Sequence, residues 1–226
     1  MEGSEPRQSF RDLTVGDFVG RLASSAPVPG GGSASAVAAS LGAGLVAMVA
    51  ALSQDRPRYA EHADLHADVE PRGRALAARL LTIADEDAAA YAAFGAAARL
   101  PRATPDEQAA RSVAMQAAAR TASDVPLRCV EACLEIVSLA ESLAGRSNVN
   151  AASDLDVAAL LSEAAARGAA ANVLINLPSV GDETYAAAAK TRVTALLDDV
   201  VRIAALVHAR VAEGVARPPI LSHPVA

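Results

Sequence analysis

The sequence predicts an all-α protein: a single-domain antiparallel bundle of long, Pro-kinked helices around a central helix rich in Ala and Gly. Of 226 residues, 52% are hydrophobic but only 3% are aromatic. Much of the apolar fraction is Ala, which has the highest intrinsic helix propensity. No segment shows the sustained period-two alternation of a strand. A chain of this length buries roughly 70% of its unfolded surface, so it needs neither metal nor disulfide to fold.

The charge balance argues against several classes of partner. The chain has 20 Lys and Arg against 26 Asp and Glu, a net charge of −6, and no basic block. Nucleic acid and anionic membranes both require a concentrated positive field, so neither is predicted as a partner. The N-terminus is acidic and lacks an apolar stretch, so no secretory signal is expected. Cys129 and Cys133 are predicted to be core thiols, as is usual in the reducing cytoplasm.

The N-terminal third contains a short helix followed by the central one. Thr14 and Asp17 form a capping-box variant that opens a helix to about Ser24. Residues 33–52 then carry no charge over twenty positions, a length that also suits a membrane span. Their Ala, Ser and Gly content differs from the Leu, Ile and Phe that drive insertion. We therefore expect the central helix of a soluble bundle.

The remaining helices are delimited by caps and prolines. Residues 59–99 are helical in pattern, with a kink or break expected at Pro71 and Gly73. Three start signals follow, at Thr104–Glu107, Ser153–Asp156 and Gly181–Glu183. The first opens a long helix to about Ala144 that Pro126 interrupts, and the last opens one to about Glu213. With no linker in the sequence, residues 1–226 are predicted to form one domain, with a core at about 10–213 and an extended tail at 214–226.

Three local clusters could support chemistry, and each has an ordinary structural explanation. The Gly-rich segment 27–33 lets backbone amides approach a ligand, or simply turns the chain. The polar segment 145–154 suits a heterocycle, or is a turn followed by a Ser cap. Asp87 and Tyr91 share one helix face with Asp85 and Glu86 nearby, although acidic residues on a helix are usually solvated.

A metal site is a weaker alternative. His62 and His66 lie four residues apart, a spacing that can hold a metal across one helical turn. Their neighbourhood is charged and no third ligand is evident, so solvated histidines are the favoured interpretation.

Several motifs occur together in a characteristic order. They are Pro-x-Pro-Gly-Gly-Gly-Ser at 27–33, Leu-Ser…Tyr at 52–59, Asp-x-x-Ala-Tyr at 87–91, Leu-Pro-Arg at 100–102, Val-Pro-Leu at 125–127, Asn-x-x-Ser-Asp at 150–154 and Asn-Val-x-Ile-Asn-Leu at 172–177. In this order they resemble the formiminotransferase-cyclodeaminase C-terminal domain family over roughly residues 10–213.

The resemblance implies an all-helical, homodimeric enzyme acting on the one-carbon bridge between N5 and N10 of tetrahydrofolate. Because the sequence contains no formiminotransferase segment, we expect a methenyltetrahydrofolate cyclohydrolase. The alternatives are a formiminotetrahydrofolate cyclodeaminase and a non-catalytic folate- or partner-binding helical dimer. The folate derivative is then the substrate, with no tightly bound cofactor and no metal, and the expected location is the cytoplasm.

The resemblance also assigns roles to residues. It implies that Asp154 and Asp87 are the catalytic carboxylates, one stabilising the methenyl cation and one taking a proton from water. The implied substrate-binding residues are Gly30, Gly31, Gly32, Ser33, Asn150, Ser153 and Arg102, the last at a position where the family usually has Lys. Two departures stand out: Asp156 replaces a common Gly, and residues 53–59 replace a Lys-rich stretch.

Overall fold

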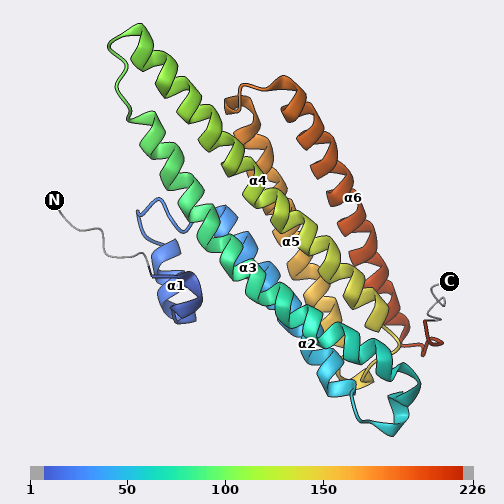
Figure 1. Cartoon of the computed structure of the whole chain (residues 1–226). Coiled ribbons are helices and arrows are strands. Elements are labelled where there is room, and N and C mark those ends of the chain that lie inside the picture. The colour runs from blue at the N-terminus through green and yellow to red at the C-terminus, as the bar shows by residue number, and fades with distance from the viewer. Residues whose placement is uncertain (1–7, 221–226) are drawn as a thin grey trace.

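Helix α2 (Gly31–Ser53) is the centre of the bundle and packs against three other long helices, α3 (Ala63–Ala98), α4 (Pro105–Leu143) and α5 (Ala152–Asn176). Helix α6 (Glu183–Glu213) packs on α4 and α5. The computed structural model describes residues 8–220 and shows these long helices side by side along one common direction (Figure 1). Within those residues there is no strand, which confirms the predicted all-α class.

The short elements connect or flank the long helices. Helix α1 (Val15–Leu22) lies beside the bundle, and 3₁₀ helix η1 (Phe10–Asp12) joins it to α3, because Asp85 accepts hydrogen bonds from Ser9 Oγ and the Phe10 N–H. The other 3₁₀ helices are η2 (Pro57–His62), η3 (Val149–Ala151) and η4 (Leu177–Ser179). Asp85 therefore has a structural role.

Most predicted helix starts are confirmed, and one is wrong. Thr14 and Thr104 cap α1 and α4 through the N–H groups of Asp17 and Glu107, and Asp182 caps α6. Ser153 is not a cap, because α5 continues directly from η3 and begins one residue earlier, at Ala152.

A kink or a break was expected at Pro71 and Gly73, and the helix is not broken there, since α3 continues through both residues. Gly73 instead marks a close contact between helices: a Cβ there would lie 2.9 Å from the Ala47 Cβ and 3.0 Å from the Ala43 carbonyl oxygen of α2. Helix α4 likewise continues through Pro126. The small residues of these helices allow their backbones to approach closely.

The two histidines predicted to be solvated are buried. The exposed fraction of His62 is 5% and that of His66 is 0%. His66 Nε2 lies 2.9 Å from the carbonyl oxygen of Arg146, so this nitrogen carries the hydrogen. The prediction failed because the histidines pack where η2 and α3 meet the α4–α5 connection, a contact between distant parts of the sequence. Cys129 and Cys133 are free, buried thiols, as predicted.

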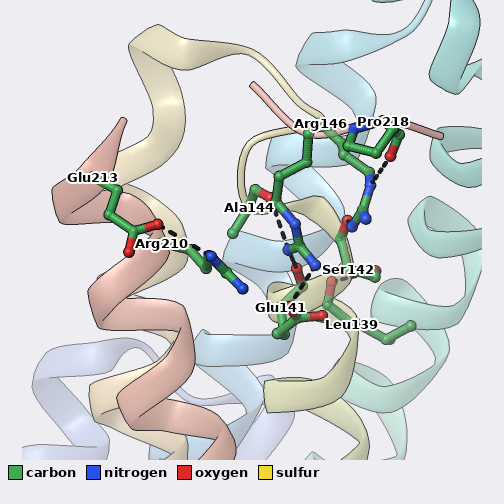
Figure 2. A network of polar contacts seen from close by, with 9 residues as sticks. Leu139, Glu141, Ser142, Ala144, Arg146, Arg210, Glu213 and Pro218 are labelled. Atoms are coloured by element: carbon green, nitrogen blue, oxygen red, sulfur yellow. Dashed lines mark hydrogen bonds and ion pairs between the residues drawn. The ribbon is translucent and has the colours of Figure 1, made fainter. Parts of the chain in front are cut away.

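The segment that follows α6 is hydrogen-bonded to the end of α4 and the α4–α5 connection. Helix α6 ends at Gly214, which has a left-handed φ of 63°, and residues 215–220 are not helical, as predicted. Arg217 donates hydrogen bonds to the carbonyls of Glu141 and Ala144, and Arg146 Nε donates to that of Pro218 at 2.6 Å (Figure 2). The rest of the predicted tail, 221–226, lies outside the described residues.

Two segments are long and apolar enough to cross a membrane by length and composition: Gly31–Ser53 and Val149–Ser179. About half of each is buried within the bundle, as expected for helices that pack against other helices.

Candidate functional site

Four of the predicted site residues line a cavity of about 380 Å³ at the N-terminal end of α2. Three parts of the chain build most of its wall: the Gly-rich loop with the start of α2, the segment of α3 around Asp87, and the last turns of α5. Tyr91 and Phe94 of α3 are two of only six aromatic residues in the chain. The cavity therefore combines a carboxylate, two aromatic rings and a glycine-rich wall.

Among residues 8–220, Asp87 is the only acidic residue in the wall of this cavity. Burial raises the pKa of its carboxyl group above the ordinary value of 3.8, and hydrogen bonds from the Ser33 side chain and the Ser33 backbone partly oppose that rise. The Ser33 hydroxyl lies 2.8 Å from Asp87 Oδ2. A partly desolvated carboxylate of this kind is a stronger base than one in water.

Ser33 can serve either protonation state of Asp87. Its hydroxyl oxygen lies 2.8 Å from Asp87 Oδ2 and 3.1 Å from the carbonyl oxygen of Ala84, and a hydroxyl has one hydrogen to donate. It donates to Asp87 when the carboxylate is ionised. When Asp87 is protonated, the carboxyl can donate to Ser33 while Ser33 donates to Ala84. The pair can thus take up and release a proton without leaving a buried group unpaired.

Gly32 gives Asp87 the space that it needs. A Cβ at position 32 would lie 2.1 Å from Asp87 Oδ1 and 2.7 Å from Oδ2. Both distances are too short for a non-bonded contact, so any side chain there would clash with the carboxylate. The neighbouring Gly31 is unlike this, because its Cβ would meet only the amide nitrogen of Asn172 at 3.8 Å. The close approach of the Asp87 carboxylate to the α2 backbone therefore explains why glycine is needed at position 32 but not at position 31. Helix α2 begins at Gly31, and Gly30 at the capping position offers no side chain to the first N–H groups. In this first turn the Ser33 backbone already bonds to Asp87.

The predicted site residues fall into separate places. Gly30, Gly31, Gly32, Ser33 and Asp87 come together at the N-terminal end of α2. Asn150, Ser153 and Asp154 lie together at the opposite end of the bundle, where the Asn148 N–H donates to Ser53 Oγ at 2.8 Å.

The distance between the two predicted catalytic acids follows from α5. Asn172 of α5 lines the Asp87 cavity, and Asp154 lies eighteen residues earlier on the same helix. At 1.5 Å per residue the separation is roughly 27 Å along the axis. One chain does not bring Asp154 and Asp87 to the same substrate.

Arg102 and Asp156 also lie away from the cavity. Arg102 is exposed on the loop between α3 and α4, at the tip of the longest helical hairpin (Figure 1). Asp156 Oδ1 lies 3.0 Å from His208 Nδ1, so this departure from the family pattern connects α5 to α6. Residues 53–59, the other departure, contact the α4–α5 connection, where Tyr59 accepts a hydrogen bond from the Val149 N–H.

The residue-by-residue predictions missed Asn172, Asn176 and Phe94, all of which line the cavity. The signal for the asparagines is their spacing of four within 172–177, which places both on one helix face. Across residues 8–220, no group of three or more His, Cys, Asp or Glu side chains is arranged to hold a metal ion.

Comparisons with known proteins agree on one family. The family model described as formiminotransferase-cyclodeaminase matches residues 14–195. A methenyltetrahydrofolate cyclohydrolase from Methylorubrum extorquens is 41% identical over 174 residues, covering 76% of this chain and 83% of the relative. The formimidoyltransferase-cyclodeaminase of Rattus norvegicus is 35% identical over 204 residues, which are 90% of this chain but 38% of that protein.

A solved structure has the same fold. The formiminotetrahydrofolate cyclodeaminase of Thermotoga maritima superposes with a TM-score of 0.81 at 23% identity, covering 90% of this chain and 98% of the other. The family match spans most of the chain, and the motifs around Gly32 and Asp87 that suggested the resemblance lie within it. The chain belongs to the formiminotransferase-cyclodeaminase family.

Proposed function

We propose that this chain is a methenyltetrahydrofolate cyclohydrolase, an enzyme that hydrolyses the N5,N10-methenyl bridge to 10-formyltetrahydrofolate. The observation that carries the proposal is the partly desolvated Asp87 carboxylate beside the Gly-rich loop, in a chain 41% identical to a relative of that name. The substrate is a cation delocalised over N5, the bridge carbon and N10, which a carboxylate in a cavity stabilises.

In this proposal Asp87 is the general base. Water adds to the bridge carbon and gives one proton to the Asp87 carboxylate, which leaves a neutral hydroxyl adduct. The N5–carbon bond then breaks as the hydroxyl loses its proton and N5 gains one, so the carbonyl stays on N10 as a formyl group. Overall one water is consumed and one proton released. The raised pKa of Asp87 suits both uptake and release of that proton.

The backbone at the start of α2 binds the oxygen atoms of the substrate. The uncapped N–H groups after Gly30 carry the positive end of the helix dipole, which favours a carbonyl or carboxylate oxygen. Arg102, on the exposed α3–α4 loop, is the proposed partner of the glutamate portion of folate, because Arg can pair bidentately with a carboxylate.

A homodimer accounts for the uncharged face of α2. Leu41, Met48 and Leu52 are 38–59% exposed on a helix without a single charged residue, and Val157 and Leu160 of the adjacent α5 are also exposed. Exposed apolar surface of this kind is typical of a protein interface. We propose that a second copy covers it, in the cytoplasm, in preference to lipid or nucleic acid.

A dimer in which two α2 helices run antiparallel also explains the separated acids. The Gly31 end of each α2 would then lie beside the Ser53 end of the other, where Asn150, Ser153 and Asp154 are located. Asp154 of the second copy would complete the Asp87 site. In this arrangement both predicted carboxylates serve one substrate.

The second candidate is the formiminotetrahydrofolate cyclodeaminase reaction, which releases ammonia and forms the methenyl compound. It is favoured by the rat relative and by the structural match, both named for that activity. The same cation and the same carboxylate occur in both reactions.

One assay separates these functions. The near-ultraviolet absorbance of the methenyl group is followed with purified protein and methenyltetrahydrofolate, and in parallel with formiminotetrahydrofolate. Loss of absorbance above the buffer rate is the expected result, and a gain with the second substrate would establish the cyclodeaminase. If the absorbance changes with neither substrate, in a folded protein that still binds tetrahydrofolate, the chain is a non-catalytic folate-binding protein. When the same assay is run on Asp87→Asn, the control variant is Asp106→Asn, the same change of residue at an exposed position on α4.

A further inference from the structure

Two asparagines of α5 give the cavity a second polar wall. Asn172 and Asn176 are one helical turn apart and both line the cavity that Asp87 enters from α3. Neither has a role in the chemistry described above.

The orientation of both amides is fixed by their hydrogen bonds. Asn172 Nδ2 donates to the Gly168 carbonyl at 2.9 Å, and Asn176 Nδ2 donates to the carbonyls of Ala122 and Asn172, both at 2.9 Å. A carbonyl oxygen only accepts hydrogen bonds, so the atoms facing these carbonyls must be the NH₂ groups. Each side-chain oxygen therefore points away from the backbone that its nitrogen contacts.

The two side-chain oxygens have no donor among residues 8–220. No hydrogen bond to Asn172 Oδ1 or Asn176 Oδ1 is formed there, and neither oxygen is among the fully buried unpaired atoms. They are consequently accessible acceptors on two residues that line the cavity. Because their nitrogens are held, the amides cannot flip to offer donors without losing three hydrogen bonds.

The ligand that fits this wall must present two neighbouring N–H donors. A neutral amide oxygen cannot donate a hydrogen bond to a carboxylate or phosphate group, and the ionised Asp87 carboxylate is also only an acceptor. Tyr91 and Phe94 add aromatic surface to the same cavity, which suits a flat heterocycle. The pterin ring of a folate presents N3–H and a 2-amino group side by side, on the edge remote from N5 and its one-carbon bridge.

We propose that Asn172 Oδ1 and Asn176 Oδ1 accept hydrogen bonds from N3–H and the 2-amino group of the pterin ring, and so are the residues that select a pterin. This inference rests on the proposed function and names its specificity residues. It leaves Asp87 free for the bridge end of the substrate, since the pterin edge is held by α5.

The test is a binding cycle that pairs a change in the protein with a change in the ligand. Dissociation constants for tetrahydrofolate and its 2-desamino analogue are measured by calorimetry with the wild type and with Asn172→Ala and Asn176→Ala. The wild type is expected to bind tetrahydrofolate roughly 10- to 100-fold more tightly, because the analogue leaves an acceptor unpaired. In at least one alanine variant that ratio should fall to near one.

A variant that keeps the acceptor oxygen distinguishes loss of the ligand contact from loss of protein stability. Asn172→Asp retains oxygen toward the ligand but loses the donor to Gly168, so it should be less stable to heat yet keep the ratio. Thr191→Ala is the matched control: this side chain also donates to the carbonyl four residues earlier, that of Ala187 at 3.0 Å, but it lies on α6 and does not line the cavity. It should keep the wild-type ratio.

The outcomes separate the two proposals. An unchanged ratio in both alanine variants, or a ratio lost only in Asp87→Asn, would overturn the role of the asparagines while turnover by the wild type leaves the proposed function standing. A wild type that binds no tetrahydrofolate would overturn both.

Discussion

Ser33 and Asp87 are hydrogen-bonded at 2.8 Å although 54 positions separate them in the sequence. The contact joins the first turn of the central helix to the C-terminal half of α3, so the Gly-rich loop and the carboxylate are positioned together. Gly32 makes the contact possible, because any side chain there would occupy the place of the carboxylate.

Asp87→Asn should leave the protein at least as stable as the wild type at pH 7. Burial raises the folded-state pKa of Asp87 above 3.8, so the stabilisation associated with this group is complete below pH 3.8 and is lost as the pH rises through the raised pKa. An asparagine removes the buried charge and still accepts from Ser33. Thermal unfolding at pH 7 measures this, and a clearly lower melting temperature would contradict the assigned shift.

Gly32→Ala should displace Asp87 and reduce turnover by roughly 100-fold or more, because a general base that loses its position forfeits most of its effect. The added Cβ would lie 2.1 Å from Asp87 Oδ1. Gly31→Ala is the matched control for the fold, since its Cβ meets nothing closer than 3.8 Å, and it should unfold at the wild-type temperature. Equal activity of Gly32→Ala and the wild type would show that Asp87 is not the base.

Ser33→Ala should shift the acid limb of the kcat profile to higher pH. The reaction requires ionised Asp87, whose pKa is raised by burial and lowered again by the Ser33 hydrogen bond. Removing the bond takes away stabilisation of the charged form, so the pKa rises further. Profiles from pH 4 to 8 for both proteins give the comparison. An acid limb that stays in place or moves down would refute the coupling.

His62 should make the protein less stable in mild acid. Its pKa lies below 6.5 chiefly through burial, with His66 and Arg146 acting in the same direction and Glu61 opposing them. The stability linked to neutral His62 is therefore present above pH 6.5 and is lost as the pH falls through the lowered pKa. Melting temperatures from pH 7.5 to 5 should decline less in His62→Asn. The exposed His208→Asn should retain the wild-type decline, and identical curves for all three would exclude His62 as the cause.

Asp154→Asn should lower turnover if the second copy completes the site. Mixing inactive Asp154→Asn with inactive Asp87→Asn after partial unfolding and refolding then restores activity, because half of the dimers are mixed and each contains one intact site. A shared site in a twofold dimer predicts recovery to about a quarter of the wild-type rate. No recovery in a verified mixed dimer would show that the second copy does not complete the site, and full activity of Asp154→Asn alone would show that Asp154 is not needed.

Helices and caps were the most predictable part of the fold. The capping box at Thr104 and the cap at Asp182 are local, since side chain and backbone lie within four residues of each other. Gly73 was misjudged because its role is a contact with Ala43 and Ala47 of another helix, which no local pattern shows. The burial of His66 likewise depends on Arg146, eighty residues away.

The site was predictable in part for the same reason. Gly32 and Asp87 could be proposed from motifs, but only the fold shows that one exists to make room for the other. The sequence could not show which amide atoms of Asn172 and Asn176 face the cavity, because backbone carbonyls of the folded helices set the orientation of each amide. Asp154 is far from Asp87 because α5 runs antiparallel to α2, so that α5 begins at the Ser53 end of the bundle and ends at the cavity. No local sequence pattern shows this direction.

The most direct test of the central claim compares the wild type with Asp87→Asn in one experiment: the rate at which methenyltetrahydrofolate absorbance is lost at pH 7. We predict loss with the wild type well above the buffer rate, and a rate about 100- to 10,000-fold lower with the variant, as for removal of a general base. Wild-type turnover unaffected by Asp87→Asn in a folded protein would contradict the account.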